Sequence, residues 1–205
     1  MLHVGVGRRN VQNVGSGNGA SLIKALNPID WYRFNIGLTD AGGGVCSTWA
    51  SQGSGAHSLT QSVGGTQPLI QSDRSLLFDG VDDTMATGAF TLNQPVTEYI
   101  LMQQVTWTNN ERFFDGLSGA VGIDQNTASP QIRMTAGSIL ANSSNFAVGI
   151  YAVLACVFNS TSSVMQVNNT AAITGDAGVN NPGGLTLGSN RVPAVFSNVS
   201  VKEWI

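Results

Sequence analysis

The chain has 205 residues, of which 10% are charged and 42% are hydrophobic, and its formal net charge is −3. Its basic residues form no cluster larger than the pair Arg8–Arg9, which excludes a basic face for nucleic acid. The longest apolar stretch, residues 146–158, is shorter than the roughly 20 residues that a membrane-spanning helix needs. We therefore expect a soluble protein with neither a nucleic-acid nor a membrane partner.

Residues 1–28 contain scattered Gly, Asn and Ser with little periodicity, which predicts an extended N-terminal arm. They lack the order of a charged start, an apolar block and a small-residue cleavage site, so we expect no secretory signal peptide. An arm of this kind can attach a small protein to a larger assembly, and the alternative is a terminus with no such role. The attachment residues would be Val4, Val6, Arg8, Arg9, Val11 and Val14.

Short apolar runs alternate with turn clusters from residue 29 to the end, and helical spacing is almost absent. The runs have strand length and are rich in β-branched or aromatic residues. They lie at 29–38, 75–78, 97–107, 110–116, 129–136, 149–159, 163–169, 184–189 and 194–205. This pattern predicts an all-β domain over residues 29–205, in which two antiparallel sheets pack face to face as a jelly-roll sandwich.

Two of these runs allow finer predictions from the two-residue period of a strand. Both faces of residues 148–158 are apolar, which predicts a central strand that is covered on each side. At the C-terminus, Val195, Val199, Val201 and Ile205 share one face, which predicts a half-buried strand. Trp31, Trp49 and Trp204 are expected in the core.

The two cysteines, Cys46 and Cys156, lie far apart in the sequence. Cys156 sits in the apolar run YAVLACVF, where a small buried hydrophobe is the expected role. Two cysteines alone indicate little about the compartment, so a disulfide between them stays an alternative.

One series of motifs in the first third of the chain resembles the concanavalin A-like lectin/glucanase superfamily, in its laminin-G-like and pentraxin-like branch. The motifs are Trp49, Gly53-Ser54-Gly55, His57, Gln67-Pro68 and the segment LFDGVDD at residues 77–83. The resemblance extends over most of residues 29–205 and implies a β-sandwich. It implies little about function, because this scaffold serves lectins, adhesion modules, hydrolases and virion proteins alike.

The segment LFDGVDD brings Asp79, Asp82 and Asp83 close together in the sequence. The Asp-Gly step predicts a tight hairpin turn in which Asp79 bonds its own backbone. Members of the superfamily often bind calcium near the sheet edge, so the resemblance implies calcium as the one candidate cofactor. Its further ligands would come from Asn109, Asn110, Asp115 or Asp124.

Residues 107–112 are the candidate carbohydrate-binding segment. A flat aromatic ring can stack on the apolar face of a sugar, and Trp107 lies at a strand end beside Asn109, Asn110 and Arg112. The alternative is that Trp107 is half-buried core.

The usual catalytic patterns are absent from the sequence. None of the glutamates Glu98, Glu111 and Glu203 has an acidic partner two residues away, as glycoside hydrolases on this scaffold have. Only two histidines occur, without a Gly-x-Ser-x-Gly elbow or a phosphate-binding Gly-Lys-Ser loop. No catalytic residue is therefore assigned, and the chain is not expected to be an enzyme.

A chain that begins with Met, lacks an export signal and pairs an arm with a lectin-like sandwich resembles a tailed-phage virion protein. The leading hypothesis is a structural decoration, head-fibre or tail component. It would be made in the bacterial cytoplasm, displayed on the virion surface and anchored by its arm. Its partners would be other virion proteins and further copies of itself, in a trimer or another homo-oligomer. The competing hypothesis is a lectin-like module that attaches to glycans on a host surface.

Overall fold

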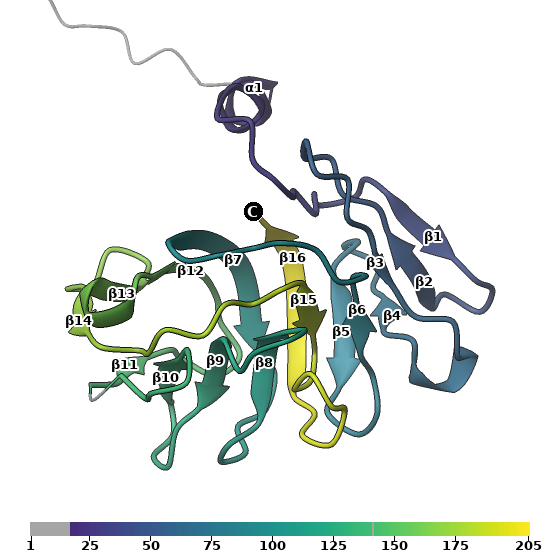
Figure 1. The fold of residues 1–205 in the computed structure, drawn as a ribbon. Helices are drawn as coiled ribbons and strands as arrows, with labels where there is room; N and C mark the ends of the chain where they lie inside the picture. The colour runs from purple at the N-terminus through teal and green to yellow at the C-terminus, as the bar shows by residue number, and fades with distance from the viewer. Residues whose placement is uncertain (1–16, 141) are drawn as a thin grey trace, which may run out of the picture.

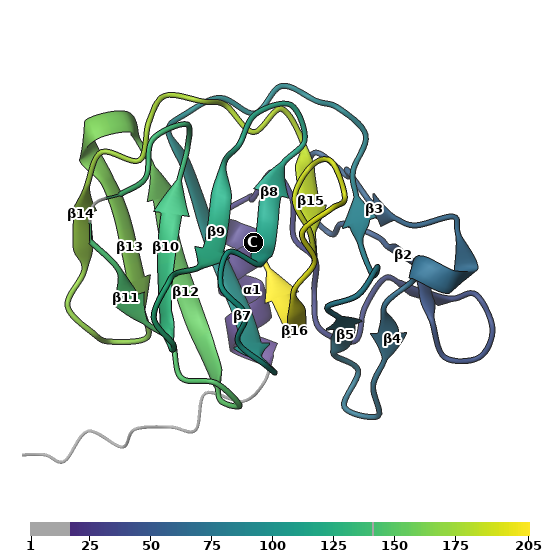
Figure 2. The same cartoon turned by 90° about the horizontal axis from the view of Figure 1, so that it is seen from below.

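The structure is a computed structural model that describes residues 17–140 and 142–205. Two antiparallel sheets pack face to face and form a β-sandwich (Figure 1). Figure 2 shows the same molecule turned by 90°, with strands β8–β10 of one sheet lying in front of β7 and β12 of the other. This architecture confirms the all-β sandwich predicted from the sequence. Within the described ranges, no helix is long and apolar enough to cross a membrane.

Sheet B contains nine strands among the described residues, in the order β1-β2-β3-β6-β15-β8-β9-β10-β11. Their bounds are β1 Leu38–Asp40, β2 Cys46–Trp49, β3 Leu59–Thr60, β6 Met85–Ala86, β15 Leu185–Leu187, β8 Arg112–Gly116, β9 Gly122–Gln125, β10 Gln131–Thr135 and β11 Ser144–Asn145.

Sheet A contains seven strands, again counted over the residues that the structure describes, in the order β14-β13-β12-β7-β16-β5-β4. Their bounds are β14 Ile173–Gly175, β13 Ser163–Val167, β12 Tyr151–Phe158, β7 Val96–Gln104, β16 Asn198–Trp204, β5 Leu76–Asp79 and β4 Leu69–Ile70. Single 3₁₀ turns lie at Gly64–Thr66 and Ser160–Ser162.

The core lies between the two sheets and is rich in aromatic residues. The ring of Tyr32 lies 5.7 Å from that of Trp49 and 5.8 Å from that of Trp204, and Phe114 packs on Trp204 at 5.2 Å. Trp31, Trp49 and Trp204 are 4%, 1% and 1% exposed, which confirms their predicted place in the core. Burying one such side chain contributes about 2–3 kcal/mol.

Helix α1, Gly17–Ala25, was not predicted, because its sequence GNGASLIKA is short and carries two glycines. Beyond its last residue, Asn27 adopts a left-handed φ of 49° and Pro28 follows, and together these stop the helix. Figures 1 and 2 place α1 on the outer side of sheet A, apart from both sheets. The predicted attachment residues Val4, Val6, Arg8, Arg9, Val11 and Val14 lie outside the described residues.

Eight of the nine predicted runs contain a strand, and the first differs. Residues 29–38 contain a single bridge between Tyr32 and Trp204, and β1 begins only at Leu38. Asn35 and Gly37 have φ values of 59° and 79°, so the chain turns where the apolar pattern predicted extension. Residues in this left-handed conformation interrupt an extended strand even where apolar side chains continue the strand pattern.

Two finer predictions need correction. Strand β12 is covered on one face only, since Val153 on its other face is 43% exposed. The sandwich has two layers, and no third layer covers the outer face of sheet A there. In β16 a bulge between Val201 and Glu203 shifts the register, so that Trp204 instead of Ile205 points inward.

Both cysteines are free and buried, which excludes the disulfide alternative. Cys156 is fully buried as predicted, and burial raises the pKa of its thiol.

Candidate functional site

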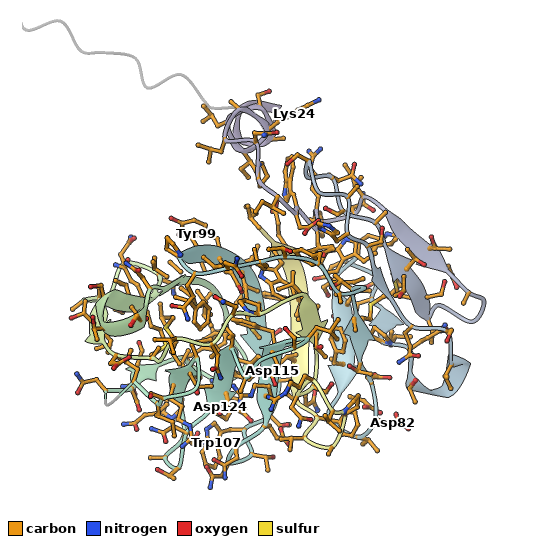
Figure 3. The ribbon with its side chains drawn as sticks, viewed as in Figure 1. Lys24, Asp82, Tyr99, Trp107, Asp115 and Asp124 are labelled. Atoms are coloured by element: carbon orange, nitrogen blue, oxygen red, sulfur yellow. The ribbon has the colours of Figure 1, made fainter. Side chains whose placement is uncertain are left out.

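A row of charged side chains crosses three strands of sheet B on the face turned away from the core. Arg112 of β8, Asp124 of β9 and Arg133 of β10 are direct cross-strand neighbours. Because residues alternate along a strand, Ile123 points into the core while Asp124 next to it points outward. Asp124 therefore lies between two arginines, and Figure 3 shows it on the same side of the molecule as Trp107.

The carboxylate of Asp124 is bound from both sides. Arg133 Nε donates to Asp124 Oδ1 at 2.7 Å, and Arg112 Nη2 lies 3.5 Å from Oδ2. Arg133 Nη2 also donates to Asn110 Oδ1 at 2.7 Å. Asp124 is 4% exposed; burial raises the pKa of its carboxyl, and the two guanidinium groups counteract that shift. A buried carboxylate bound by two arginines holds both guanidinium groups in fixed positions on the outer face of the sheet.

Gln125 fixes the loop formed by residues 105–111, which follows β7. Its backbone carbonyl accepts from the Asn110 N–H at 2.9 Å, and its side-chain oxygen accepts from the Thr108 N–H at 3.0 Å. Its side-chain nitrogen donates to the Thr106 carbonyl at 2.8 Å. Gln125 itself is fully buried, so the loop is tied to the sandwich interior. This bonding brings Trp107 and Asn110 beside the charged row.

We call Trp107, Asn110, Arg112, Asp124 and Arg133 the arginine site. The segment that carries its first three members leaves three buried polar atoms without a hydrogen-bond partner: Trp107 Nε1, Glu111 Oε2 and Arg112 Nη1. Buried polar groups normally have partners, because an unsatisfied one costs about 1–3 kcal/mol. The Glu111 carboxylate is held by Thr108 and the Asn198 N–H, and it points to the opposite face from its neighbour Arg112. Trp107 Nε1 and Arg112 Nη1 are therefore the two donors that a polar ligand with hydrogen-bond acceptors would satisfy.

A second buried carboxylate lies on the same face of sheet B. Asp115 Oδ1 accepts from the Val121 N–H at 2.9 Å, and its Oδ2 lies 3.5 Å from Arg191 Nη1. Its charge contributes to raising the pKa of Asp124. Since both oxygens of Asp115 have partners, we assign it a structural role under the loop that carries Arg191.

The four residues predicted to bind carbohydrate are only partly brought together. Three of them, Trp107, Asn110 and Arg112, belong to the arginine site, and Trp107 is half-buried. Asn109 is exposed on the loop, and no role is assigned to it. The sequence analysis missed Arg133 and named Asp124 only as a calcium ligand. The signal for Arg133 was a charged residue between the apolar Ile132 and Met134 in QIRMT, which marks the outer face of a strand. Asp124 in GIDQ lies between Ile123 and the polar Gln125 and carried no such signal.

The three aspartates predicted as a calcium site do lie together. Carboxylate oxygens of Asp79, Asp82 and Asp83 lie within 4.8 Å of one another. The predicted turn is present too, because Asp79 Oδ1 accepts from the Val81 N–H at 2.8 Å and Asp83 Oδ2 accepts from the Asp79 N–H at 3.0 Å. Burial, with repulsion from Asp79 and Asp82, raises the pKa of Asp83 to about 6.

These residues fit a hard cation in part. One oxygen each of Asp79 and Asp83 already accepts a backbone N–H, and calcium takes six to eight oxygen ligands. The further ligands that the resemblance implied do not join them, since Asp115 and Asp124 have arginine partners elsewhere and Figure 3 shows both apart from Asp82. Calcium binding therefore stays a prediction.

The motif around His57 has a structural role. Asp30 accepts from the His57 N–H and bonds its ring Nδ1, both at 2.9 Å, and the imidazole stacks on Phe90 at 3.7 Å. A Cβ at Gly53 would collide with the Ile29 carbonyl oxygen, so this close approach requires glycine. The Gly53-Ser54-Gly55 motif thus holds residues 28–30 against the sandwich.

Comparison with known proteins finds similarity of fold only. No protein-family model matches the chain, and no curated protein matches it. The solved structures that match include Trypanosoma rangeli sialidase in complex with 2,3-difluorosialic acid, with 12% identity, a TM-score of 0.56 and 87% of this chain covered. The same sialidase in complex with sialic acid has 14% identity, a TM-score of 0.53 and 85% covered. A mutant that displays trans-sialidase activity has 12% identity and a TM-score of 0.52.

This chain spans 30% of the length of each of these sialidase chains. At such identities the likeness shows the β-sandwich and does not transfer an activity. It does correct one expectation. The chain was not expected to be an enzyme, yet six of the solved structures that match are Trypanosoma rangeli sialidase or a mutant of it, and sialidases are enzymes. The absence of familiar catalytic motifs was too weak a ground for that expectation.

Proposed function

We propose that this chain is a carbohydrate-recognition β-sandwich that binds a glycan at the arginine site. The observation that carries the proposal is the pair of unpartnered buried donors, Trp107 Nε1 and Arg112 Nη1. Sugar hydroxyls accept hydrogen bonds, so a hydroxyl-rich ligand would pair with the Trp107 and Arg112 donors after small side-chain rotations, while the Glu111 carboxylate is held by Thr108 and the Asn198 N–H. The half-buried indole of Trp107 offers a ring for stacking.

Two further observations support the proposal. The arginine site lies on a rigid sheet, and Arg133 is held by both Asp124 and Asn110, so its guanidinium is oriented in advance. One matching structure is a sialidase in complex with sialic acid, which makes a glycan a reasonable ligand class for the scaffold.

A glycan array with the full chain tests this proposal, followed by titration of any glycan found. We expect Trp107→Ala to weaken binding by about tenfold or more. Phe34→Ala is the matched control, because Phe34 is an exposed aromatic that is not part of the arginine site, and it should bind like the wild type. Equal binding by the wild type and Trp107→Ala, or no glycan bound above background, would refute the proposal.

A second candidate function is that of a virion surface component held by its N-terminal segment. The observation that favours it is the exposure of Leu22, Leu26 and Ile29, which are 67%, 78% and 51% accessible. A nine-residue helix is marginally stable in water without a partner, so apolar side chains on it suit attachment to another protein. The partner would be a capsid or tail protein or further copies of this chain, in a trimer or another homo-oligomer.

This candidate and the first can both hold, since a displayed protein can bind surface glycans. Production of particles with a chain that lacks residues 1–27 distinguishes them. Loss of the truncated chain from purified particles, with glycan binding retained, would support attachment by this segment. Normal incorporation of the truncated chain would refute it.

A further inference from the structure

A cavity of about 290 Å³ opens at the end of the sandwich on the α1 side, away from the arginine site. Its wall is formed by four segments of the chain: residues 28–32, residues 91–99, Leu185 of β15 and residues 204–205 at the end of β16. Ile29 and Tyr99 at its mouth are 51% and 48% exposed, so the cavity reaches solvent. Figure 3 shows Tyr99 on the side of the molecule where α1 lies, with Asp124 and Trp107 on the other side.

Glu98 is the unusual residue in this wall. It occupies an inward position of β7 between Val96 and Ile100, where an apolar residue is the rule, and it is 4% exposed. Its carboxylate has one hydrogen bond among the described residues, from Trp204 Nε1 to Oε2 at 3.1 Å. None of the ion pairs of the described residues includes it.

No cation from residues 17–140 or 142–205 forms an ion pair with this carboxyl. The titratable groups near it are Tyr32 and Asp30 from residues 28–32 and Cys156, its neighbour on β12. Tyr99 follows Glu98 on β7 and points to the opposite, outer face. None of the residues that line the cavity is Lys, Arg or His. A buried carboxylate without a cationic partner is costly to ionise, so a positively charged ligand would find charge complementarity here.

The rest of the wall fits an alkyl cation. The rings of Tyr32 and Trp204 line the cavity 5.8 Å apart, and aromatic faces attract cations. Leu92 and Pro95 offer apolar surface for a short stem. The volume lies near the lower end of the roughly 300–1,000 Å³ typical of ligand pockets, which limits the ligand to a small group.

We propose that this cavity binds a primary ammonium group on a short alkyl stem, with the Glu98 carboxylate as its counter-ion. The ammonium belongs either to a free alkylamine or to a lysine side chain of a protein partner. This inference is independent of the glycan proposal, because none of the residues that line the cavity belongs to the arginine site.

The protonation of Glu98 predicts how ligand affinity depends on pH. Burial raises the pKa of Glu98 to about 8, so the empty cavity holds a neutral carboxyl at pH 7. An ammonium favours the ionised form, and its binding therefore releases a proton. Affinity should rise as the pH increases from 6 to 8.5, while an alkylammonium with a pKa of about 10.4 stays charged.

Calorimetric titration of the full chain with n-butylammonium, 1-butanol and Nα-acetyl-lysine methylamide tests the inference. We expect n-butylammonium to bind at millimolar concentration and more tightly at pH 8.5 than at pH 6, with butanol about tenfold weaker or worse. Binding of the lysine amide as well would identify a protein partner as the source, and its failure to bind would identify a free amine.

Glu98→Gln should abolish the preference for the ammonium over the alcohol. Glu203→Gln is the matched control, because Glu203 also accepts from a tryptophan, Trp31 Nε1 at 2.6 Å, but does not line the cavity. Circular dichroism of both variants checks that they are folded. Equal affinity of the wild type for n-butylammonium and butanol, unchanged binding by Glu98→Gln, or no binding of n-butylammonium at millimolar concentration would overturn the inference.

Discussion

The carboxylate of Glu98 accepts a hydrogen bond of 3.1 Å from the indole nitrogen of Trp204, deep inside the sandwich. The pairing joins β7 to β16 within one sheet and places an acid where the strand pattern requires an apolar residue. Its consequence for stability can be measured directly.

Glu98→Gln should make the protein more stable above neutral pH. The pKa of Glu98 is raised from 4.5 to about 8, so between these values the unfolded chain releases a proton that the folded chain keeps. The stabilisation by the proton is complete below pH 4.5 and is lost as the pH rises through 8. The glutamine keeps the acceptor for Trp204 and does not titrate. We expect a gain on the order of a few kcal/mol at pH 8.5 in urea unfolding.

The comparison of pH 6 with pH 8.5 isolates Glu98, because Asp83 titrates mostly below that window. Glu203→Gln serves as the control and should keep the wild-type slope. An identical fall in stability for the wild type and Glu98→Gln would mean that the acid is not buried in the folded state.

Asp83→Asn should stabilise the protein at pH 7 in the absence of calcium. Burial and the neighbouring charges raise the pKa of Asp83 from 3.8 to about 6, so the folded state loses stability as the pH rises through this range. The amide oxygen can still accept from the Asp79 N–H. We expect a gain of about 1–2 kcal/mol by thermal unfolding at pH 7, and none at pH 3.

Calcium would reverse the sign of that result. A bound cation stabilises the ionised carboxyl, so the wild type would gain stability in millimolar calcium and Asp83→Asn would not. Thermal scans with calcium and with a chelator distinguish the two cases. A chelator that leaves the wild-type midpoint unchanged argues against the calcium site.

Arg133→Lys should destabilise the protein although the charge is kept. Lysine cannot reproduce the two-point contact in which Nε meets Asp124 while Nη2 meets Asn110. We expect a loss of about 1–2 kcal/mol in urea unfolding. Arg74→Lys is the control, because Arg74 is an exposed residue whose Nε bonds the Asn35 side chain, and its effect should be small. Equal losses of stability for Arg133→Lys and Arg74→Lys would show that the two-point contact of the Arg133 guanidinium does not stabilise the protein.

Leu22→Ser combined with Leu26→Ser should leave the thermal midpoint of the sandwich unchanged. Both side chains are mostly exposed on and just after α1, so they contribute little to the core. If they contact a partner or another copy, the variant should lose that association in light scattering or in particle assembly. A large fall in the midpoint would instead indicate that α1 is part of the sandwich's stability.

The sequence alone determined the fold class and eight of the sixteen strands in the described residues. Period-two patterns such as those of β7 and β12 reflect the pleat, a local property that each strand carries in its own residues. The Asp-Gly turn at Asp79 was likewise readable, because its hydrogen bonds run between near neighbours. Part of the arginine site was also predicted from the sequence, namely Trp107, Asn110 and Arg112.

Only the tertiary structure decided which side chains meet across strands. Arg133 reaches Asp124 and Asn110 through strand pairing and a loop, over 9 and 23 positions of sequence, and no local pattern encodes those distances. The bulge in β16 that turns Trp204 inward is likewise set by pairing with β7. The cavity at Glu98 depends on four distant segments that converge at one end of the sandwich. Local periodicity fixes which face a residue takes, and the register between strands fixes its neighbours.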